Sequence, residues 1–425
     1  MQKATFSRRT FLAATGLAGA SVLAGAQMAE RPGNRVRIGF VGVGARGTGL
    51  LKVLLSRPDT EVPAICDIAP AHLERAQQMV EQVHGGRPEG YGRDEYDYRR
   101  MLERDDLDAV LVATPARWHA GMAVDTLRAG KHVATEVPGA HTVDECWALV
   151  KAKEESGKRY MLLENCVYFR NNMMVMNMAH AGAAGTLYYG ECGYIHDCRS
   201  LRFRADGALT WRGEAKRDRF GNLYPTHSLG PVSKWMGIHH GDRLTSLTSR
   251  MSEPRVLQEY ASDRFGEDSP AARTRFKAGD MSVTLLHTAK GRLVTVYYDS
   301  DSPRPNSNFY LLQGSKGVFD SRFGIYLDEA SPREQWEPVD KFREAHEHAY
   351  WREHAEEARK TGHGGGDYFV IADFVDMVRT DSEPLVDVYD SAAWSSLIPL
   401  SAQSIEQDGA PVAIPDFTQG AWAHA

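Results

Sequence analysis

Three glycines follow a short apolar run near the start of the chain, in the pattern Gly-x-Gly-x-x-Gly. The run occupies residues 36–41, and the glycines are Gly42, Gly44 and Gly47. In a strand–turn–helix unit the first glycine permits the tight turn, the second lets the backbone approach a pyrophosphate, and the third lets the helix pack closely on the strand. The helix N-terminus then points backbone N–H groups at the phosphates. The pattern predicts an α/β domain that binds a dinucleotide.

An acidic residue follows the glycines at the spacing that such a site requires. The apolar run 62–65 leads into Asp67, about 20 residues past the glycines, where the 2′-hydroxyl of an NAD ribose is usually held. This spacing predicts NAD as the cofactor. The alternative interpretation is a glycine-rich turn that merely opens an ordinary α/β domain.

Residues 35–160 alternate between short apolar runs and amphipathic segments, and Thr142 with Glu145 has the pattern of a helix capping box. Such alternation predicts a doubly wound parallel sheet. We expect strands at 61–66, 107–113, 131–135 and 160–163, helices at 48–55, 70–83, 118–129 and 142–156, and a loop at 84–91.

Within residues 161–425 several short runs instead alternate with period two, and Ala289-Lys290-Gly291 separates two such runs as in a hairpin. We expect strands at 185–194, 281–286, 292–298, 309–313 and 317–319, and late helices at 367–379 and 390–407. The predicted fold class is therefore α/β, with an N-terminal Rossmann domain and a C-terminal α+β domain whose open sheet is mainly antiparallel. A chain of 425 residues is long enough for two such cores. An open sheet face in such folds commonly packs against a second copy, so we expect a homo-oligomer.

The first 26 residues have the pattern of an export signal. Ser7-Arg8-Arg9-Thr10-Phe11-Leu12 is a twin-arginine motif, and Ala24-Gly25-Ala26 fits a cleavage site before Gln27. The apolar run between them is too short and too rich in glycine for a stable membrane span. We expect a signal peptide at 1–26, recognition by the twin-arginine export machinery, and a periplasmic or exported mature protein with no membrane association. A cytoplasmic amphipathic tail is the alternative.

The predicted export bears on the cofactor. Because a periplasm is not expected to supply NAD freely, an exported protein that uses it repeatedly should hold NAD+ tightly and regenerate it within each cycle, which favours redox-neutral chemistry. The formal net charge is −6 and no strong basic patch is present, so nucleic acid is not an expected partner.

The cysteines are five in number, which is odd, and they form no Cys-x-x-Cys motif. Cys192 and Cys198 are close enough in sequence to pair in an oxidising compartment, but buried free thiols are the preferred interpretation.

Polar residues follow three of the expected parallel strands. Thr114 to His119 follows one, Glu136-Val137-Pro138 a second, and Glu164-Asn165 a third. Because ligands bind outside the carboxyl ends of the strands in doubly wound folds, we expect these segments to line the nicotinamide end of the cleft. The alternative is that they serve only as turns.

These residues together resemble the Gfo/Idh/MocA oxidoreductases, which pair an NAD(P)-binding Rossmann domain with a C-terminal α/β domain. The resemblance rests on the three glycines, Asp67, Thr114-Pro115 with His119, and Glu136-x-Pro138. Dehydrogenases of that group typically carry a lysine where this chain has Val137. A valine cannot accept or donate a proton, so alcohol dehydrogenation by that lysine is not expected.

The second half of the chain is similar to glycoside hydrolase family 109. The resemblance runs from about residue 35 to the C-terminus, and its most specific block is Gly221 to Pro231, which contains Tyr224-Pro225-Thr226-His227. Further matching segments are 161–165, 193–197, 241–243 and 303–305. The resemblance implies a retaining α-N-acetylgalactosaminidase that holds NAD+ without consuming it, an exception to two-carboxylate hydrolysis. C3 of the sugar is oxidised, the C1 substituent is eliminated, water adds, and the hydride returns.

The resemblance also implies site residues. His227 is expected to be the general base, because its ordinary pKa lies near working pH, with Tyr224, Tyr194 and Glu164 assisting proton transfer or binding. Substrate contacts are expected from Tyr194, Arg212, Tyr224, Pro225, Thr226, His227 and Asn306. NAD contacts are expected from Gly42, Gly44, Arg46, Gly47, Asp67, Ala116, Arg117, Trp118, His119, Glu136, Val137, Asn165 and Tyr224. Taken outside its block, His227 would be interpreted as a structural histidine in a turn.

Three further features of the sequence bear on the site. Relatives often have tyrosine where this chain has Asn306, which puts the preference for N-acetylgalactosamine in question. His346, His348 and His354 are interpreted as part of a solvated helix rather than a metal site, and the implied mechanism needs no metal. The segment 363–367, His-Gly-Gly-Gly-Asp, is expected to be a flexible turn that leads to an Asp-capped helix, and similar family sequences suggest that it approaches the active site.

Two other functions are compatible with a nicotinamide domain. A periplasmic sugar oxidoreductase would exchange hydride between two sugars or with a soluble acceptor, and Val137 argues against it. A non-catalytic sugar-binding protein that holds NAD structurally would have no use for Glu164, Tyr194, Tyr224 and His227 together. The preferred prediction is the NAD-dependent glycoside hydrolase.

Overall fold

The computed structural model describes residues 35–424 and contains two sheets. The predicted signal peptide at 1–26 lies outside the described residues. Among the helices between residues 35 and 424, none combines the length and the apolar character that a membrane crossing requires.

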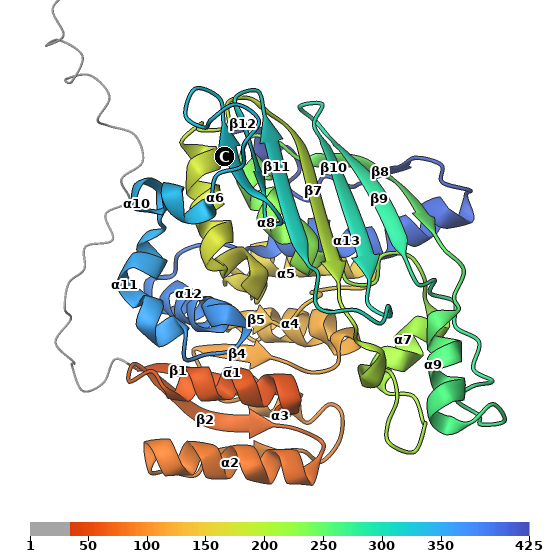
Figure 1. The fold of residues 1–425 in the computed structure, drawn as a ribbon. Helices are drawn as coiled ribbons and strands as arrows, with labels where there is room; N and C mark the ends of the chain where they lie inside the picture. The colour runs from red at the N-terminus through yellow and green to blue at the C-terminus, as the bar shows by residue number, and fades with distance from the viewer. Residues whose placement is uncertain (1–34, 425) are drawn as a thin grey trace, which may run out of the picture. The chain divides into compact units, whose positions relative to one another are not determined.

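The first sheet has six parallel strands in the order β3-β2-β1-β4-β5-β6 (Figure 1). This is the strand order of a Rossmann fold, as predicted. The strands are β1 (Val36–Val41), β2 (Thr60–Cys66), β3 (Glu89–Tyr91), β4 (Ala109–Val112), β5 (His132–Thr135) and β6 (Tyr160–Leu162). The helices around them are α1 (Ala45–Leu55), α2 (Pro70–His84), α3 (Tyr98–Leu102), α4 (His119–Arg128) and α5 (Val143–Ser156).

Local sequence chemistry explains these elements. Every residue of β4 and β5 is buried, as expected for strands covered by helices on both faces. The capping box of α5 is confirmed, because Thr142 Oγ1 accepts from the Glu145 N–H at 3.1 Å and Glu145 Oε2 accepts from the Thr142 N–H at 3.0 Å. The prediction of a loop at 84–91 is wrong at its end, where β3 pairs with β2. Its three residues are too few to show a period.

The second sheet has eight strands in the order β13-β12-β11-β7-β10-β9-β8-β14. Only β7 and β10 pair in parallel, so the sheet is mainly antiparallel, as predicted, and the hairpin at 289–291 joins β9 to β10. The strands are β7 (Leu187–Ile195), β8 (Leu244–Met251), β9 (Ser282–Thr288), β10 (Leu293–Asp299), β11 (Phe309–Gly314), β12 (Gly317–Asp320), β13 (Gly324–Leu327) and β14 (Val412–Ala413).

Helices cover one face of this second sheet. Helix α8 packs on β7 and β11, and α13 packs on β8, whereas Val283, Leu285 and Leu293 on the other face are 36–39% exposed. The remaining helices are α6 (Arg170–His180), α7 (Trp211–Asp218), α8 (Thr226–Met236), α9 (Val256–Phe265), α10 (Arg343–His346), α11 (Ala349–Ala358), α12 (Gly366–Thr380) and α13 (Val388–Glu406). Helices α6 to α9 were not predicted, whereas the solvated helix expected around His346, His348 and His354 corresponds to α10 and α11.

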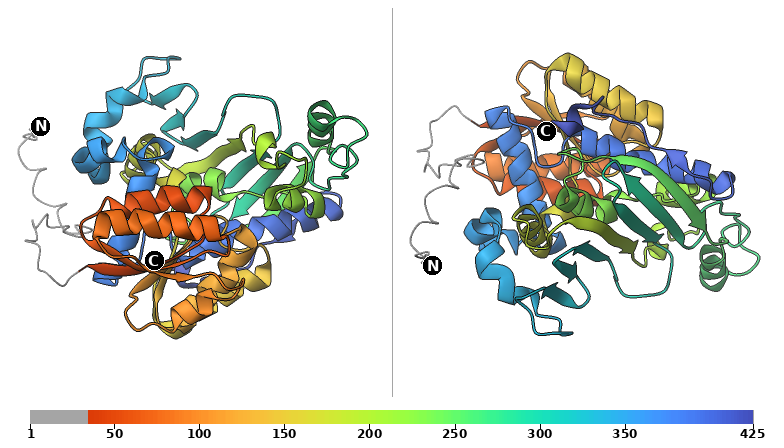
Figure 2. Two further views of the ribbon diagram at one scale, coloured as in Figure 1. Left: turned by 90° about the horizontal axis from the view of Figure 1, so that it is seen from below. Right: turned by 90° about the horizontal axis from the view of Figure 1, so that it is seen from above.

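A small lobe extends beyond the sheet at the end opposite α10 and α11 (Figures 1 and 2). It carries α7 and α9 and has its own hydrophobic cluster, made of Phe203, Leu257, Ala261, Ala271 and Phe276. The main core is one continuous cluster that runs through both sheets. All five cysteines are buried free thiols, so Cys192 and Cys198 are not paired and the preferred interpretation is confirmed.

Candidate functional site

The glycine turn has the geometry that its sequence predicts. Gly42 has a φ of +86°, and a Cβ there would lie 2.8 Å from the Ala113 and Thr114 backbone. A Cβ on Gly47 would lie 1.9 Å from the Gly42 carbonyl oxygen. A Cβ on Gly44 would meet no protein atom closer than His72 at 3.9 Å. The turn therefore packs tightly everywhere except beside Gly44, which is the open space that a pyrophosphate would fill.

Asp67 lies beside this turn, at the end of β2. Its two carboxylate oxygens accept from the Val43 and Ala69 N–H groups, both at 2.8 Å. The carboxylate is thus held rigidly at the carboxyl edge of the sheet, where it fits a ribose hydroxyl and would repel a 2′-phosphate. The residues present fit NAD.

Three predicted cofactor residues meet at the strand ends, together with Asp367 from the segment 363–367, which was expected to approach the active site. Arg46 Nε donates to Glu136 Oε1 at 2.6 Å, and its Nη1 and Nη2 donate to the two oxygens of Asp367 at 2.7 and 2.9 Å. Asn165 Nδ2 also donates to Asp367, at 2.9 Å. Burial disfavours the charged Asp367 carboxylate, but His363 and Arg46 lower its pKa well below the usual range.

The prediction that Asp367 caps its helix is wrong. The N-cap of α12 is Gly365, which makes no side-chain cap, and Asp367 lies in the first helical turn facing Arg46. An aspartate after a glycine run signals a helix start, but the sequence does not show that its partner lies 321 residues away.

The segment after β4 contributes mostly backbone. Both ring nitrogens of buried His119 lie 2.8 Å from carbonyl oxygens, those of Pro138 and Thr114, and burial lowers its pKa. His119 therefore links the segments that follow β4 and β5. Trp118 packs edge-on against Tyr96 with ring centroids 5.6 Å apart. Ala116 and Val137 are buried, and Arg117 is exposed. Their contacts with NAD stay a prediction.

A histidine–carboxylate pair lies where β6 meets α8. His227 Nδ1 is 2.7 Å from Glu164 Oε1. Glu164 follows β6, whereas His227 lies in the first turn of α8, so the interpretation of His227 as a turn residue is wrong. Gly230 makes this approach possible, because a Cβ there would lie 3.1 Å from Glu164 Cγ. The Glu164 side chain is fully buried, and His227 keeps 14% exposure.

Charge stabilises the protonated ring of His227. Burial alone would lower its pKa, but Cys166 and the Glu164 carboxylate raise the pKa well above the ordinary value. For Glu164, burial favours the neutral acid, but His227 lowers the pKa below the ordinary value. The two groups therefore form an imidazolium–carboxylate pair that titrates as a unit.

Two tyrosine rings surround His227. The ring of Tyr194 lies 5.3 Å from both Tyr224 and His227, and Tyr224 lies 5.0 Å from His227. Burial raises the pKa of Tyr224 to about 12 and raises that of Tyr194 still further. Both are neutral phenols at working pH, able to donate a hydrogen bond. The structure thus brings the four predicted catalytic residues together, and their roles stay predictions.

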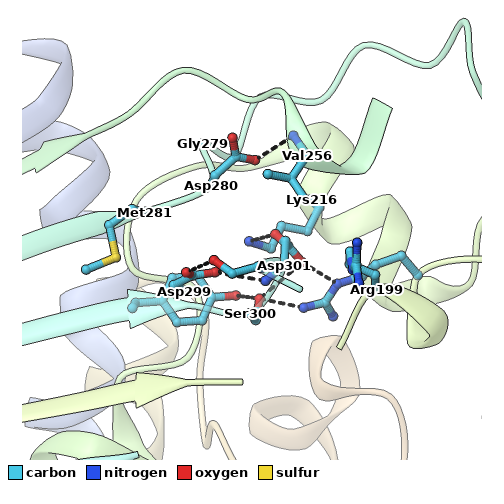
Figure 3. Close-up of polar contacts among 12 residues, drawn as sticks. Arg199, Lys216, Val256, Gly279, Asp280, Met281, Asp299, Ser300 and Asp301 are labelled. Carbon is cyan, nitrogen blue, oxygen red and sulfur yellow. Dashed lines mark hydrogen bonds and ion pairs between the residues drawn. The ribbon is translucent and has the colours of Figure 1, made fainter. Parts of the chain in front are cut away.

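The lobe carries Arg212, whose guanidinium lies 4.1 Å from the Trp211 ring. One turn along α7, Lys216 faces Asp301 on the turn after β10, with Nζ 2.6 Å from Oδ2 (Figure 3). Both side chains are 1% exposed, and Arg202 Nε also lies 3.2 Å from Asp301. This buried cluster fixes the helix of Arg212 against the end of the sheet. The sequence contains no local signal for it, because its members are far apart in the chain.

The other predicted substrate residues lie around these groups. Pro225 is the N-cap of α8, and Thr226 is its buried first residue. Asn306 lies on the exposed loop between β10 and β11, where its Oδ1 accepts from the Asn308 N–H at 3.1 Å.

Residues of metal-ligand type come close together at one place within residues 35–424. Ligand atoms of Glu164, Cys166 and His227 all lie within 4.8 Å of one another, and the first and third of these residues are already paired. His346, His348 and His354 belong to no such group in the described part of the chain.

Two family models match the chain. "Oxidoreductase family, NAD-binding Rossmann fold" matches residues 36–163, and "Glycosyl hydrolase 109, C-terminal domain" matches residues 168–424. A relative from Solibacter usitatus named "Glycosyl hydrolase family 109 protein" is 39% identical over 92% of this chain and 90% of its own length. One of the same name from Stenotrophomonas maltophilia is 36% identical over 98% and 96%.

Solved structures show the same fold at low identity. An oxidoreductase domain protein from Kribbella flavida superposes with a TM-score of 0.71 at 21% identity, covering 90% of this chain and 100% of its own. Levoglucosan dehydrogenase in complex with NADH and L-sorbose gives 0.70 at 18% identity, with the same coverage. Taken with the glycine turn and the family models, these findings establish a nicotinamide-binding Rossmann domain joined to a family-specific C-terminal domain. The chain belongs to glycoside hydrolase family 109.

Proposed function

We propose that this protein is an NAD-dependent retaining glycoside hydrolase, similar to α-N-acetylgalactosaminidase, that leaves NAD+ unconsumed. The observation that carries the proposal is the Glu164–His227 pair, 2.7 Å apart. It lies beside two neutral tyrosines, at the carboxyl edge of a sheet that binds a dinucleotide. A proton acceptor at this edge suits chemistry in which a sugar carbon is first oxidised and then loses a proton.

Bound NAD+ would supply the acceptor for the C3 hydride of the sugar and would return that hydride at the end. A ketone at C3 makes the C2 hydrogen acidic, so a modest base can remove it. His227 takes that proton in its deprotonated form, which becomes populated as pH rises towards its raised pKa, and Glu164 stabilises the imidazolium so formed. The C1–O bond breaks as the C1–C2 double bond forms, and a proton goes to the leaving oxygen. Water then adds at C1 while the proton returns to C2, which gives net hydrolysis.

The tyrosines and Arg212 are proposed to hold the sugar. Tyr194 and Tyr224 keep their protons at working pH, because burial raises the pKa of each. They can therefore donate hydrogen bonds to sugar oxygens or pass a proton to the departing one. Arg212 is proposed to reach the same sugar from α7, a helix that the buried Lys216–Asp301 pair holds against the end of the sheet.

The test is a panel of α- and β-nitrophenyl glycosides, incubated in D2O without added NAD. We expect release of nitrophenol and one deuterium at C2 of the free sugar, read by mass spectrometry. Release without C2 deuterium would contradict the mechanism. A sugar product of altered oxidation level would indicate an oxidoreductase, and turnover of no sugar would indicate a binding protein.

A second comparison in the same panel tests which sugar the protein cleaves. Asn306 puts an amide where relatives often have an aromatic ring, so stacking on the sugar is lost. We expect N-acetylgalactosaminides to be cleaved, and Asn306→Tyr to lower KM for them without changing NAD content. A better substrate in another sugar class would move the assignment to that sugar.

Export and assembly are also proposals. The twin-arginine motif at 7–12 supports a periplasmic location and loading of NAD+ before export, which requires tight retention. The uncovered face of the second sheet supports a homo-oligomer. Comparison of fractionated cells that express the chain with Arg8 and Arg9 intact, or both replaced by lysine, tests export. Periplasmic protein in the first case alone is the expected result.

A further inference from the structure

The side chain of Arg46 links the cofactor turn to the C-terminal half of the chain. It belongs to the glycine pattern, yet its guanidinium is held by Glu136 after β5 and by Asp367 on α12. The pair with Asp367 is bidentate, a geometry that adds specificity as well as strength. Of the three side chains, Asp367 is 4% exposed, Glu136 10% and Arg46 24%.

Asp367 is the centre of these contacts. Its Oδ1 accepts from Arg46 and from Asn165, and its Oδ2 accepts from Arg46 and lies 2.9 Å from His363 Nδ1. Four contacts from three side chains thus converge on one carboxylate. The side chains come from the first turn of α1, the segment after β6, and the loop before α12.

The backbone before α12 is shaped to bring Asp367 into this position. His363, Gly364 and Gly365 all have positive φ, of 52°, 61° and 98°. A Cβ on Gly366 would lie 2.6 Å from the Asn165 carbonyl oxygen. A side chain at Gly366 would therefore push the start of α12 away from the segment after β6, and the positive φ at 364 and 365 is the conformation that glycine adopts without strain.

The direction of the contacts matters for the cofactor. A dinucleotide lies along the carboxyl edge of such a sheet. A continuous network of side-chain contacts runs along that edge and is made of Arg46, Glu136, Asn165 and Asp367. This network joins Arg46, beside the phosphate turn, to residues after β5 and β6 at the nicotinamide end. A dinucleotide bound in the way usual for this fold would lie along the same edge as these contacts.

We propose that Asp367 is a positioning residue for cofactor retention: its buried carboxylate holds Arg46 across the carboxyl edge and slows the release of NAD. This inference deepens the proposed function, since a hydrolase that regenerates its cofactor must keep it. It concerns binding alone, and it requires no particular substrate.

The test compares Asp367→Asn with wild type. The amide keeps the size of the side chain but loses the charge that holds Arg46. We measure NAD content of the purified full chain after denaturation, and the release rate of NADH from its fluorescence during a chase with excess NAD+. We expect Asp367→Asn to release NADH roughly tenfold faster or more, as for loss of one partner of a buried charge pair.

Asp373→Asn is the matched control. Asp373 is also a buried residue of α12, but it accepts from Tyr168 and from the Leu385 N–H instead of from the cofactor turn. This control separates loss of the Arg46 contact from general weakening of the helix. Circular dichroism of each variant at saturating NAD+ verifies that it is folded.

A double-mutant cycle with Arg46→Met tests the route of the effect. If Asp367 acts through Arg46, Asp367→Asn should change the release rate little in the Arg46→Met background. Equal release rates for wild type, Asp367→Asn and Asp373→Asn would overturn the inference. Because the readout needs no glycoside, it is independent of the glycosidase test: either proposal can fail while the other stands.

Discussion

At the scale of single residues, the Glu164–His227 pair decides how the site handles protons. The neighbouring carboxylate helps to raise the pKa of His227, so the neutral base forms only at pH values above the ordinary pKa of a histidine. The raised pKa of His227 adds stability that is complete below the pKa of histidine in the unfolded chain, about 6.5, and is lost as pH rises through the folded pKa. The lowered pKa of Glu164 acts in the opposite direction, and its contribution is lost as pH falls through the folded value.

Glu164→Gln should therefore shift the pH profile. An amide cannot stabilise the imidazolium, so the pKa of His227 falls and the acid limb of C2–deuterium exchange moves to lower pH by about one unit or more. The rate at the plateau should also fall, because the imidazolium formed in the reaction loses its partner. Exchange measured against pH checks this, with Glu61→Gln, an exposed carboxylate on β2, as control. An unshifted limb would assign the proton transfer to another group.

At the scale of elements, the packing of α1 on the glycine turn decides whether the cofactor turn forms. Gly47 faces the Gly42 carbonyl oxygen, whereas Gly49, on the same helix, faces open space. Two glycines of one helix therefore have opposite roles, one in packing and one with no packing role.

Gly47→Ala should destabilise the protein by about 1–3 kcal/mol, as for an overpacked core, and should lower its NAD content. Gly49→Ala should leave NAD content unchanged and stabilise the protein by up to about 1 kcal/mol, because alanine is the better helix former. Urea unfolding and cofactor analysis of the two variants check this. Equal effects of the two changes would contradict the packing argument.

At the scale of the whole molecule, the half-buried His141 makes global stability depend on acid. Burial disfavours the charged form of His141 and lowers its pKa to about 3. Since the unfolded chain then takes up the proton first, stability is lost as pH falls from the unfolded pKa of about 6.5 towards the folded value.

The His141→Gln variant should thus lose less unfolding free energy in acid than the wild type does. Between pH 7 and pH 5 the wild type should lose up to about 2 kcal/mol of unfolding free energy that the variant keeps. Urea unfolding at the two pH values measures the difference, and exposed His354 supplies the control variant His354→Gln. A parallel decline in wild type and His141→Gln would mean that this ring is charged in the folded state.

The uncovered sheet face carries the prediction for assembly. Leu285 is 38% exposed at the middle of β9, so Leu285→Lys should convert an oligomer into monomers by placing a charge in an apolar contact. Light scattering after size exclusion reports the mass. Leu201→Lys, a change at an exposed leucine of the lobe, should leave the mass as in wild type. A wild-type protein that is already monomeric would contradict an interface on this sheet face.

Much of the Rossmann half was predictable from sequence, because its signals are local. A glycine that must adopt positive φ, a capping box, and alternating runs each lie within a few residues. The helices of the C-terminal half were harder. Helix α8 contains Pro231 and begins inside a block that reads as a turn, and its stability comes from packing on β7 and β11 rather than from its own pattern.

The amino-acid sequence by itself determined the dinucleotide turn, the parallel doubly wound sheet that surrounds it, and the family. Only the tertiary structure decided which side chains meet: Glu164 with His227 across 63 residues, and Arg46 with Asp367 across 321. Local chemistry restricts φ, ψ and the apolar period of a short segment. It carries no information about a distant partner, which depends on how the layers pack and how closely glycines such as Gly230 and Gly366 let them approach.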